Sequence, residues 1–475
     1  MVPLPLLRTT DLMKRERLLS IPEATSAEVE AAGVECRELE FDLSQAPRLR
    51  CQTADTLYVL PRNPPQEVLW WFDFLGIEKR GLALEDFIHF ADEAVPFPTP
   101  CTVEDALALY CGFALPSRAE LAVYAQFATD PDQRSQWLRL TTDPKQENTF
   151  AAAIRGQGWC LRGLLAALLP SVNLATADLG LLLLLLSRHH MPRAYTLASS
   201  HLQQQEQQRH GITRTACICL DRHRTPRRNP QELLNLLQHH GIRPFGSLEA
   251  IPSGVHEGLC SSYLLNLKQK VAVDESGEAP PAVLCCCRPS AFKLPSKEDR
   301  PLILVAAGTG IAPFVAFAHH LAALGGARAP VCLFYGCRDI RHFLYQDLLL
   351  SYLDPDQRQQ QPPEVQQLML QQDQQHYRQQ RRPHLRVLSR IILALSRVNP
   401  ERKVYVQHKV VEEGQLVWGL LRAGAAVFVC GRPAMGKAVQ EALLSVAASQ
   451  IGQQKAEAFI KRLHDSGLYT EELWD

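Results

Sequence analysis

Residues 302–314 of this 475-residue chain hold the pattern with the clearest chemical potential. An apolar run there predicts a buried parallel strand. The run ends at Gly308, Thr309 and Gly310, and Pro313 then suits the first turn of a helix. Backbone N–H groups and a helix dipole at such a junction favour a phosphate group. The pattern predicts a phosphate-binding turn, with a purely structural glycine turn as the alternative.

The 14 cysteines do not point to a metal site. They form no C-x-x-C pair, and their one cluster is Cys285, Cys286 and Cys287. Adjacent residues of a strand point to opposite faces, so three in a row are poorly placed to bind one metal ion. We therefore expect no metal, buried thiols instead, and a reducing compartment.

Bulk composition is that of a globular chain of about three domains, with 46% hydrophobic and 21% charged residues. The formal net charge of +0 gives no overall field toward nucleic acid or an anionic membrane. The first residues lack the apolar core of a signal peptide. The most hydrophobic run, residues 179–186, is much shorter than the ~20 residues that span a bilayer. We expect a cytoplasmic protein without a membrane anchor.

Strand patterns occupy two separated parts of the chain before residue 301. The first is residues 34–65, where apolar and polar side chains alternate, and the second begins at residue 192. Residues 65–186 between them have helical patterns, and Thr102 before two acidic residues predicts a helix N-cap. A mostly helical block is thus inserted between two strand-rich segments.

Two polar insertions interrupt the second strand-rich part. Residues 203–209 are rich in glutamine, and residues 221–248 are rich in Arg, His and Asn. The arginines of the latter fit an exposed loop, with a contact to an acidic partner as the alternative. They are Arg222, Arg224, Arg227 and Arg228.

After residue 301, strands and helices alternate, which predicts a doubly wound parallel sheet. Further strands are expected at residues 331–335, 404–406 and 427–430. Half of the residues from 357 to 380 are glutamine, so residues 354–383 are interpreted as a disordered insertion.

Several short motifs, taken in order, resemble one family. The chain is similar to the FAD/NADPH half of the NADPH-dependent diflavin oxidoreductases, which have a ferredoxin–NADP reductase-like fold. The similarity runs from about residue 34 to the C-terminus. The most similar branch passes electrons to anamorsin in cytosolic iron–sulfur cluster assembly. The motifs are RAYT (193–196), GLCS (258–261), GTGIAPF (308–314), SR (396–397), KVYVQH (403–408), FVCG (428–431) and ELWD (472–475).

The resemblance implies a multidomain architecture. It implies an antiparallel β-barrel FAD domain at 33–75 and 191–296, with the polar insertions at 201–210 and 221–250. A helical connecting domain would occupy 76–190, and an α/β doubly wound NADP-binding domain 297–475. Residues 1–32 would be an N-terminal extension.

The resemblance also implies the FAD site. Arg193 would bind the pyrophosphate with its forked donors, Tyr195 would stack on the isoalloxazine ring, and Thr196 would hydrogen-bond near its reactive nitrogen. The FAD phosphates would meet the loop formed by Gly258, Leu259, Cys260 and Ser261. An ordinary strand ending in a surface arginine is the alternative for Arg193 and Tyr195.

For NADPH, the resemblance places the turn at Gly308, Thr309 and Gly310 beside the nicotinamide-side phosphates. The 2′-phosphate is a dianion that NADH lacks, and an Arg/Lys pair distinguishes it. The residues implied around the adenine ribose are Ser396, Arg397, Lys403, Tyr405 and Gln407.

The residues that would flank the nicotinamide and flavin during hydride transfer are Thr196, Cys430, Glu472 and Trp474. The cofactors carry this chemistry, and the protein positions them. Three features depart from the family pattern: Thr196 replaces a serine, Glu472 an aspartate, and Ala306-Ala307 a Gly-Pro pair. The added methyl of Ala306 puts NADPH affinity in question.

No flavodoxin-like FMN domain is visible before residue 34, so we expect a split reductase or a truncated sequence. FMN would then be supplied by another domain or chain. The expected activity is hydride transfer from NADPH to FAD, followed by single-electron transfer to an FMN protein or an iron–sulfur protein of the anamorsin type. The alternatives are another acceptor (flavodoxin, ferredoxin or haem protein) and a non-catalytic remnant that binds partners.

Overall fold

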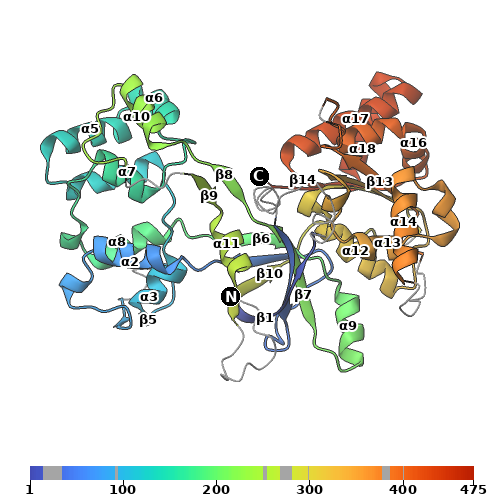
Figure 1. Cartoon of the computed structure of the whole chain (residues 1–475), viewed down its shortest axis with the longest axis horizontal. Coiled ribbons are helices and arrows are strands. Elements are labelled where there is room, and N and C mark those ends of the chain that lie inside the picture. The colour runs from blue at the N-terminus through green and yellow to red at the C-terminus, as the bar shows by residue number, and fades with distance from the viewer. Residues whose placement is uncertain are drawn as a thin grey trace. The chain divides into compact units, whose positions relative to one another are not determined.

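The computed structural model describes residues 1–13, 35–90, 95–249, 254–267, 281–297, 299–376, 386–399 and 401–474. The chain forms two compact units, shown in Figure 1. One comprises Met1–Val59, Ala194–Asp221 and Lys268–Asp475, and the other comprises Leu60–Arg193 and Arg222–Leu267.

The first part of the larger unit is a six-stranded sheet with the order β6-β3-β10-β1-β2-β7. β1 pairs antiparallel with β10 and β2, and β2 with β7. An antiparallel bridge between Leu197 and Ile218 joins the two ends of this order, which closes the sheet into a barrel. The strands are β1 (Val2–Asp11), β2 (Cys36–Asp42), β3 (Thr56–Leu60), β6 (Arg193–Thr196), β7 (Thr215–Asp221) and β10 (Ala282–Arg288).

Strand β1 corrects the expectation that residues 1–32 are an extension outside the barrel. Its side chains alternate as a strand requires, and Leu4 and Leu6 are fully buried. The expectation for residues 14–32 lies outside the described residues. Of the glutamine-rich insertion expected at 201–210, residues His201–Arg209 form helix α9, capped by Ser200.

The smaller unit is mostly helical, as predicted, and has its own hydrophobic core. Its elements before residue 193 are α2 (Pro65–Phe74), η2 (Glu78–Arg80), β4 (Phe87–Ile88), β5 (Cys101–Thr102), α3 (Val103–Asp105), η3 (Ala106–Tyr110), α4 (Arg118–Leu121), η4 (Ala122–Phe127), α5 (Pro131–Thr142), η5 (Pro144–Gln146), α6 (Glu147–Ala153), α7 (Leu161–Leu168), η6 (Leu174–Thr176) and α8 (Leu179–Ser187). The Thr102 side chain accepts a hydrogen bond from the Asp105 N–H, which confirms the predicted N-cap.

The basic insertion after residue 221 belongs to this helical unit and not to the barrel. Leu233, Leu237 and Ile242 pack in the helical core, and the Phe245 N–H donates to the Ala167 carbonyl at 2.9 Å. An amphipathic helix thus anchors a segment whose composition suggests an exposed loop. The elements of the helical unit after residue 221 are β8 (Arg224–Pro226), α10 (Pro230–His239), β9 (Val255–Glu257) and α11 (Leu259–Asn266).

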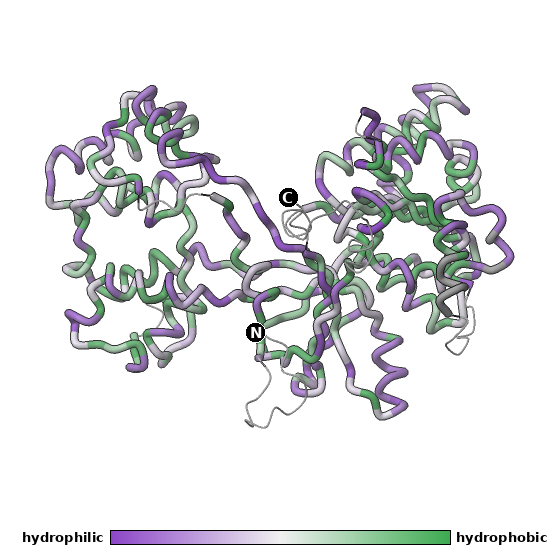
Figure 2. The backbone as a smooth tube through the Cα atoms, in the orientation of Figure 1, coloured by the Kyte–Doolittle hydropathy of each residue, from purple (hydrophilic) through white to green (hydrophobic). Residues whose placement is uncertain are grey.

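The second part of the larger unit is a parallel sheet with the order β13-β12-β11-β14-β15. Alternate residues of β11 lie in two different cores. Leu304 packs with α12 (Ala312–Ala323), and Val305 packs with α15 (Val406–Glu412), α16 (Gly414–Arg422) and α17 (Pro433–Ile451). Helices on both faces confirm the doubly wound architecture, whose strands form the hydrophobic centre in Figure 2. The strands are β11 (Leu302–Ala307), β12 (Val331–Cys337), β13 (Arg390–Leu395), β14 (Ala426–Gly431) and β15 (Tyr469–Leu473).

The helices of this domain are η7 (Gly308–Ile311), α12 (Ala312–Ala323), η8 (Ile340–His342), α13 (Gln346–Ser351), η9 (Pro355–Gln360), α14 (Pro363–His376), α15 (Val406–Glu412), α16 (Gly414–Arg422), α17 (Pro433–Ile451) and α18 (Gln453–Asp465). The strand predicted at 404–406 is wrong, because Val406 begins α15. The parallel strand after β12 is β13 instead. Within the described residues, no helix is long and apolar enough to cross a membrane.

The glutamine-rich segment is ordered over much of its length, so the expectation of disorder is wrong for α14. Val365, Leu368 and Met369 are buried on one side of this helix, at the i, i+3, i+4 spacing of an apolar stripe. The buried Gln361 side chain donates to the Ser389 carbonyl at 2.9 Å and accepts from the Ile391 N–H at 3.1 Å. Residues 377–383 of the predicted insertion lie outside the described part of the chain.

A close backbone approach makes Gly310 the most demanding glycine of the predicted turn. A Cβ there would lie 2.4 Å from the Cys430 carbonyl oxygen. We expect Gly310→Ala to destabilise this domain by about 2 kcal/mol and to lower its thermal midpoint by several degrees. Differential scanning calorimetry of the full chain checks this. Gly419→Ala, in a helix with nothing within 4 Å, is the matched control, and an unchanged midpoint for Gly310→Ala would contradict the packing argument.

Candidate active site

Strand register brings three of the four predicted hydride-transfer residues to one edge of the parallel sheet. Cys430 of β14 lies directly opposite Glu472 of β15. Trp474 follows β15, and its N–H donates to the Gly431 carbonyl at 3.0 Å. Trp474 also packs, half-buried, against the core on the α12 side of the sheet. The described C-terminal residues are therefore held in place by the parallel pairing of β15 with β14.

The Glu472 carboxyl group is in an environment that disfavours its charge. Burial raises its pKa, and a hydrogen bond with Thr196 and the positive charge of Lys293 offset only part of that effect. Its Oε2 atom is buried and has no hydrogen-bond partner among the described residues. A buried acceptor without a partner suits a site that a polar ligand group completes, such as the carboxamide of nicotinamide.

The Cys430 thiol is fully buried. Burial, followed by the negative charge of Glu472, raises the pKa of this thiol well above its usual value. The group therefore stays protonated and can act as a weak hydrogen-bond donor. Thr196, Cys430 and Glu472 together form a polar cluster in which burial disfavours the charged forms of the thiol and the carboxyl group.

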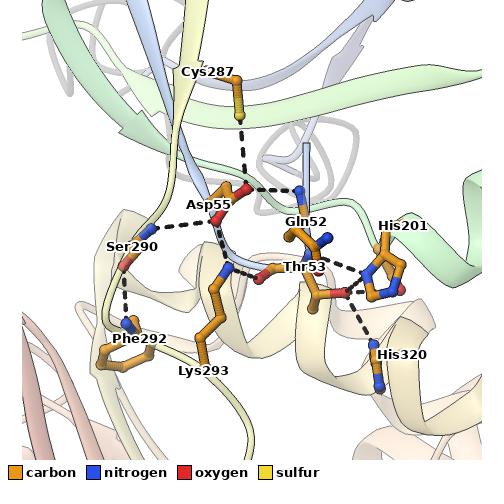
Figure 3. A network of polar contacts seen from close by, with 10 residues as sticks. Gln52, Thr53, Asp55, His201, Cys287, Ser290, Phe292, Lys293 and His320 are labelled. Atoms are coloured by element: carbon orange, nitrogen blue, oxygen red, sulfur yellow. Dashed lines mark hydrogen bonds and ion pairs between the residues drawn. The ribbon is translucent and has the colours of Figure 1, made fainter. Parts of the chain in front are cut away.

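Lys293 is the positively charged residue that acts on the Glu472 carboxyl group of this cluster. It was not predicted from the sequence. Figure 3 shows its ammonium group between Thr53 and Asp55. Its Nζ donates to the Thr53 carbonyl at 2.9 Å and pairs with the Asp55 carboxylate, which is buried. Asp55 also accepts the N–H groups of Gln52 (2.7 Å) and Ser290 (3.2 Å). The ion pair thus has the additional hydrogen bonds that a buried carboxylate needs.

Two histidines join the same network in Figure 3. The Thr53 hydroxyl lies 2.9 Å from Nδ1 of His201 and 3.0 Å from Nδ1 of His320. Burial and the charge of Lys293 lower the pKa of His201, so its ring is neutral near pH 7. The network links the loop before β3 to α9 and α12, and so holds the barrel strand next to the parallel-sheet domain.

The raised pKa of Glu472 predicts a pH-dependent stability. Because the folded state disfavours the carboxylate, the stability that Glu472 contributes is present at acidic pH and is lost as pH rises through its raised pKa. Glu472→Gln removes this titration. We expect its thermal midpoint to match that of the unsubstituted protein near pH 4 and to exceed it by about 2 °C near pH 8.

Thermal unfolding followed at several pH values checks this expectation, with the exposed Glu441→Gln as control. A lower midpoint for Glu472→Gln near pH 8 would contradict it. That result would mean that Thr196 and Lys293 stabilise the carboxylate by more than its burial costs.

The predicted FAD residues divide between the two units. Tyr195 and Thr196 are half-buried on β6 in the barrel. Arg193 begins the same strand, is exposed, and donates to the Met191 carbonyl at 2.9 Å. An exposed guanidinium beside a half-buried aromatic ring fits a ligand with both phosphates and a flat ring system.

In the helical unit, Gly258 is the N-cap of α11, and no side chain caps this helix. First-turn N–H groups are therefore left for an anion, as expected for a phosphate loop. Leu259 is half-buried and Cys260 is buried. The Ser261 hydroxyl is engaged, because it donates to the Gly258 carbonyl and accepts from the His223 N–H, each at 3.1 Å. Its structural role is to shape the loop.

The predicted NADP turn is the short helix η7 at the carboxyl end of β11. Gly308 has φ +56°, a conformation that favours glycine, and is exposed. The buried Tyr335 donates its hydroxyl to the Gly308 carbonyl at 3.1 Å, a support that the sequence alone did not indicate. Ala306 is fully buried in the core, so its methyl group does not line the turn. Ala307, the other residue of the pair that departs from the family pattern, is half-buried and directly precedes the turn.

The residues predicted around the adenine ribose follow β13 and begin α15. Arg397, Lys403 and Tyr405 are exposed, and Gln407 is half-buried. The Ser396 hydroxyl is half-buried and donates to the Cys337 carbonyl at 3.2 Å. These segments lie at the carboxyl ends of parallel strands, where doubly wound folds bind nucleotides. The same rule would have found Arg338, which directly follows β12 and is absent from the predicted set.

Protein-family comparisons first establish the class of domain. Residues 23–212 match the FAD binding domain model, and residues 304–361 match the oxidoreductase NAD-binding domain model. The barrel with its helical insertion and the parallel-sheet domain are therefore the FAD-binding and nicotinamide-nucleotide-binding parts of an oxidoreductase.

Particular relatives are NADPH–cytochrome P450 reductases. The chain is 29% identical over 463 residues to that of Aspergillus niger, 29% over 465 residues to that of Emericella nidulans, and 26% over 456 residues to that of Saccharomyces cerevisiae. Each match covers 92% of this chain but 57%, 57% and 59% of the respective relative. The chain thus spans less than two thirds of the length of these relatives.

Proposed function

We propose that the chain is an FAD-dependent NADPH reductase. It would move hydride from NADPH to FAD and then pass single electrons to an FMN or iron–sulfur acceptor. The observation that carries this proposal is the register of β14 and β15. It sets Cys430 beside Glu472, whose hydrogen bond with Thr196 extends to the strand carrying the flavin-side residues.

When bound, FAD supplies the hydride-accepting chemistry and the ability to release electrons singly. The protein's own residues bind and orient. Glu472 offers its unpartnered Oε2 to a polar ligand group, and the protonated Cys430 thiol and the Thr196 hydroxyl offer hydrogen bonds beside it. Trp474, which packs half-buried against the core that contains Cys430, is proposed to cover this cluster.

Arg193 and Tyr195 are proposed to hold FAD through its pyrophosphate and ring. The N-terminus of α11, with Gly258, Leu259, Cys260 and Ser261, would hold the phosphates. The turn at Gly308, Thr309 and Gly310 would hold the NADPH phosphates. Exposed cations support a choice of NADPH over NADH, because the 2′-phosphate needs them. The proposed ribose-side residues are Ser396, Arg397, Lys403, Tyr405 and Gln407.

The proposed acceptor is an iron–sulfur protein of the anamorsin type in cytosolic cluster assembly, reached directly or through a flavodoxin-like FMN protein. The support for this is the resemblance of GLCSSYL and KVYVQHKVVEEGQLVWGLL to that branch. A haem protein is the second candidate, because the relatives found by comparison are named as cytochrome P450 reductases.

A panel of acceptors tests the proposal. The FAD-reconstituted chain is mixed with NADPH and, in separate reactions, ferricyanide, an anamorsin-type protein, a flavodoxin-like FMN protein with and without that protein, and a cytochrome P450. Reduction of ferricyanide and of the anamorsin-type protein supports the full proposal. Reduction of the cytochrome alone moves the acceptor to haem, and failure with ferricyanide contradicts reductase activity.

A further inference from the structure

Three arginines gather at the carboxyl edge of the parallel sheet. Arg338 directly follows β12, Arg397 lies two residues beyond β13, and Arg432 directly follows β14. Because these strands are parallel, the three residues share one edge. The Arg397 N–H also donates to the Arg338 carbonyl at 2.8 Å, which fixes two of the three backbones against each other.

Arg432 borders the phosphate turn itself. β11 leads into η7 and has β12 on one side and β14 on the other, so Arg338 and Arg432 flank the turn. At Gly310 of the turn, a Cβ would lie 3.4 Å from the backbone nitrogen of Gly431, the residue before Arg432. Arg432 is also the N-cap of α17, a helix of 19 residues.

These cations are poorly compensated by the protein. Among the described residues, no ion pair within 4 Å joins any of the three guanidinium groups to a carboxylate. Burial lowers the pKa of Arg338, and the charges of Arg397 and Arg432 lower it further, against the opposing charges of Asp221 and Asp339. Asp339 is already engaged, because its carboxylate accepts from Arg341 at 2.8 Å and lies 2.9 Å from His342 Nδ1.

Like charges that nearby carboxylates compensate only in part raise the free energy of the empty site, and a multiply charged anion lowers it. The three arginines lie at two separate places along this edge, and a dinucleotide phosphate also carries its charges at two separate places. Arg338 and Arg432 lie on the two sides of the turn, whereas Arg397 follows β13, which is separated from β11 by β12. The edge therefore offers one anion position at the turn and a second beyond β12.

We propose that Arg432, together with Arg338, binds the pyrophosphate bridge of the nicotinamide dinucleotide at η7, separately from the 2′-phosphate position at Arg397. This inference rests on the proposed function and adds a residue to it. It has a distinctive consequence: Arg432 contributes equally to NADPH and NADH, because both carry the pyrophosphate, whereas Arg397 contributes to NADPH alone.

Two nucleotide fragments separate these roles by binding alone. ADP-ribose carries the pyrophosphate without a 2′-phosphate, and adenosine 2′-monophosphate carries the 2′-phosphate without a pyrophosphate. We expect Arg432→Ala to weaken ADP-ribose binding to the full chain about tenfold or more, since a charge-assisted hydrogen bond is lost. Its affinity for adenosine 2′-monophosphate should stay within about twofold. Arg397→Ala should show the reverse pattern, measured by isothermal titration calorimetry.

Arg422→Ala is the matched control, an exposed arginine of the same domain that precedes β14 and so lies toward the opposite edge of the sheet. Unchanged ADP-ribose affinity in Arg432→Ala would overturn the inference, as would an equal loss of both fragments. A chain without substitutions that binds neither fragment would instead overturn the proposed function, so the two failures are distinguishable.

Discussion

Arg193→Ala is expected to leave most of the purified protein without FAD and to weaken FAD binding about 100-fold. The Arg193 guanidinium is exposed at the start of β6, next to the half-buried Tyr195, and forked donors to a pyrophosphate are among the strongest polar contacts. The flavin absorbance per protein and the FAD dissociation constant measure the effect. The exposed Arg209→Ala, on α9, is the control.

Tyr195→Ala tests the other half of the same site. Loss of a stacked aromatic ring should weaken FAD binding less than loss of Arg193, by about tenfold. Without the stacked ring, the bound flavin should also be less firmly oriented beside Thr196, which follows Tyr195 on β6. Full flavin content in both variants would contradict the placement of FAD on β6.

The double variant Cys430→Ala, Glu472→Gln is expected to slow hydride transfer from NADPH about 100-fold. Its affinity for NADPH should fall by a smaller factor. Its two residues are opposite each other across β14 and β15, and both act on the reacting end of the nicotinamide in the proposed site. Positioned polar groups of this kind typically contribute such factors.

Rapid-mixing measurement of flavin reduction under anaerobic conditions isolates this step from electron transfer to acceptors. Glu441→Gln again serves as the control, since its side chain is exposed on α17 in the same domain. An unchanged rate in the double variant would show that Cys430 and Glu472 do not act on hydride transfer.

The sequence predicted the parallel-sheet domain well where local signals agree. The run at β11, the glycines of η7 and the proline at the start of α12 all point to one strand–turn–helix unit. The pairing of Cys430 with Glu472 was implied by family resemblance and not by any local pattern. Forty-one residues separate them in sequence, and the parallel register of β14 and β15 brings them together.

The failures have identifiable physical causes. Strand β1 contains two prolines, which mask its alternating leucines, and it gains stability only by pairing with β2 and β10. In α14, the glutamines hide a stripe of three buried apolar residues. The apolar residues Val404 and Val406 resemble a strand in sequence, but Val406 is buried as part of helix α15, and the strand after β12 is β13.

The residues that we add to the proposed site are those that act across the fold. Lys293 reaches Asp55, which is 238 positions away, and Arg338 gains its proposed role only from the neighbouring strands, which place Arg432 on the other side of the turn. A charge pattern along the chain does not show such contacts. The rule that ligands bind at the carboxyl ends of parallel strands would have found Arg338 and Arg432 once the strands were assigned.

The most direct test of the central claim is anaerobic mixing of the FAD-reconstituted full chain with one equivalent of NADPH, followed by flavin absorbance. The account predicts rapid bleaching of the bound flavin by NADPH, much slower bleaching by NADH, and recovery of the flavin absorbance on addition of ferricyanide. A protein that binds no FAD after reconstitution, or whose bound flavin stays oxidised in the presence of NADPH, would contradict it.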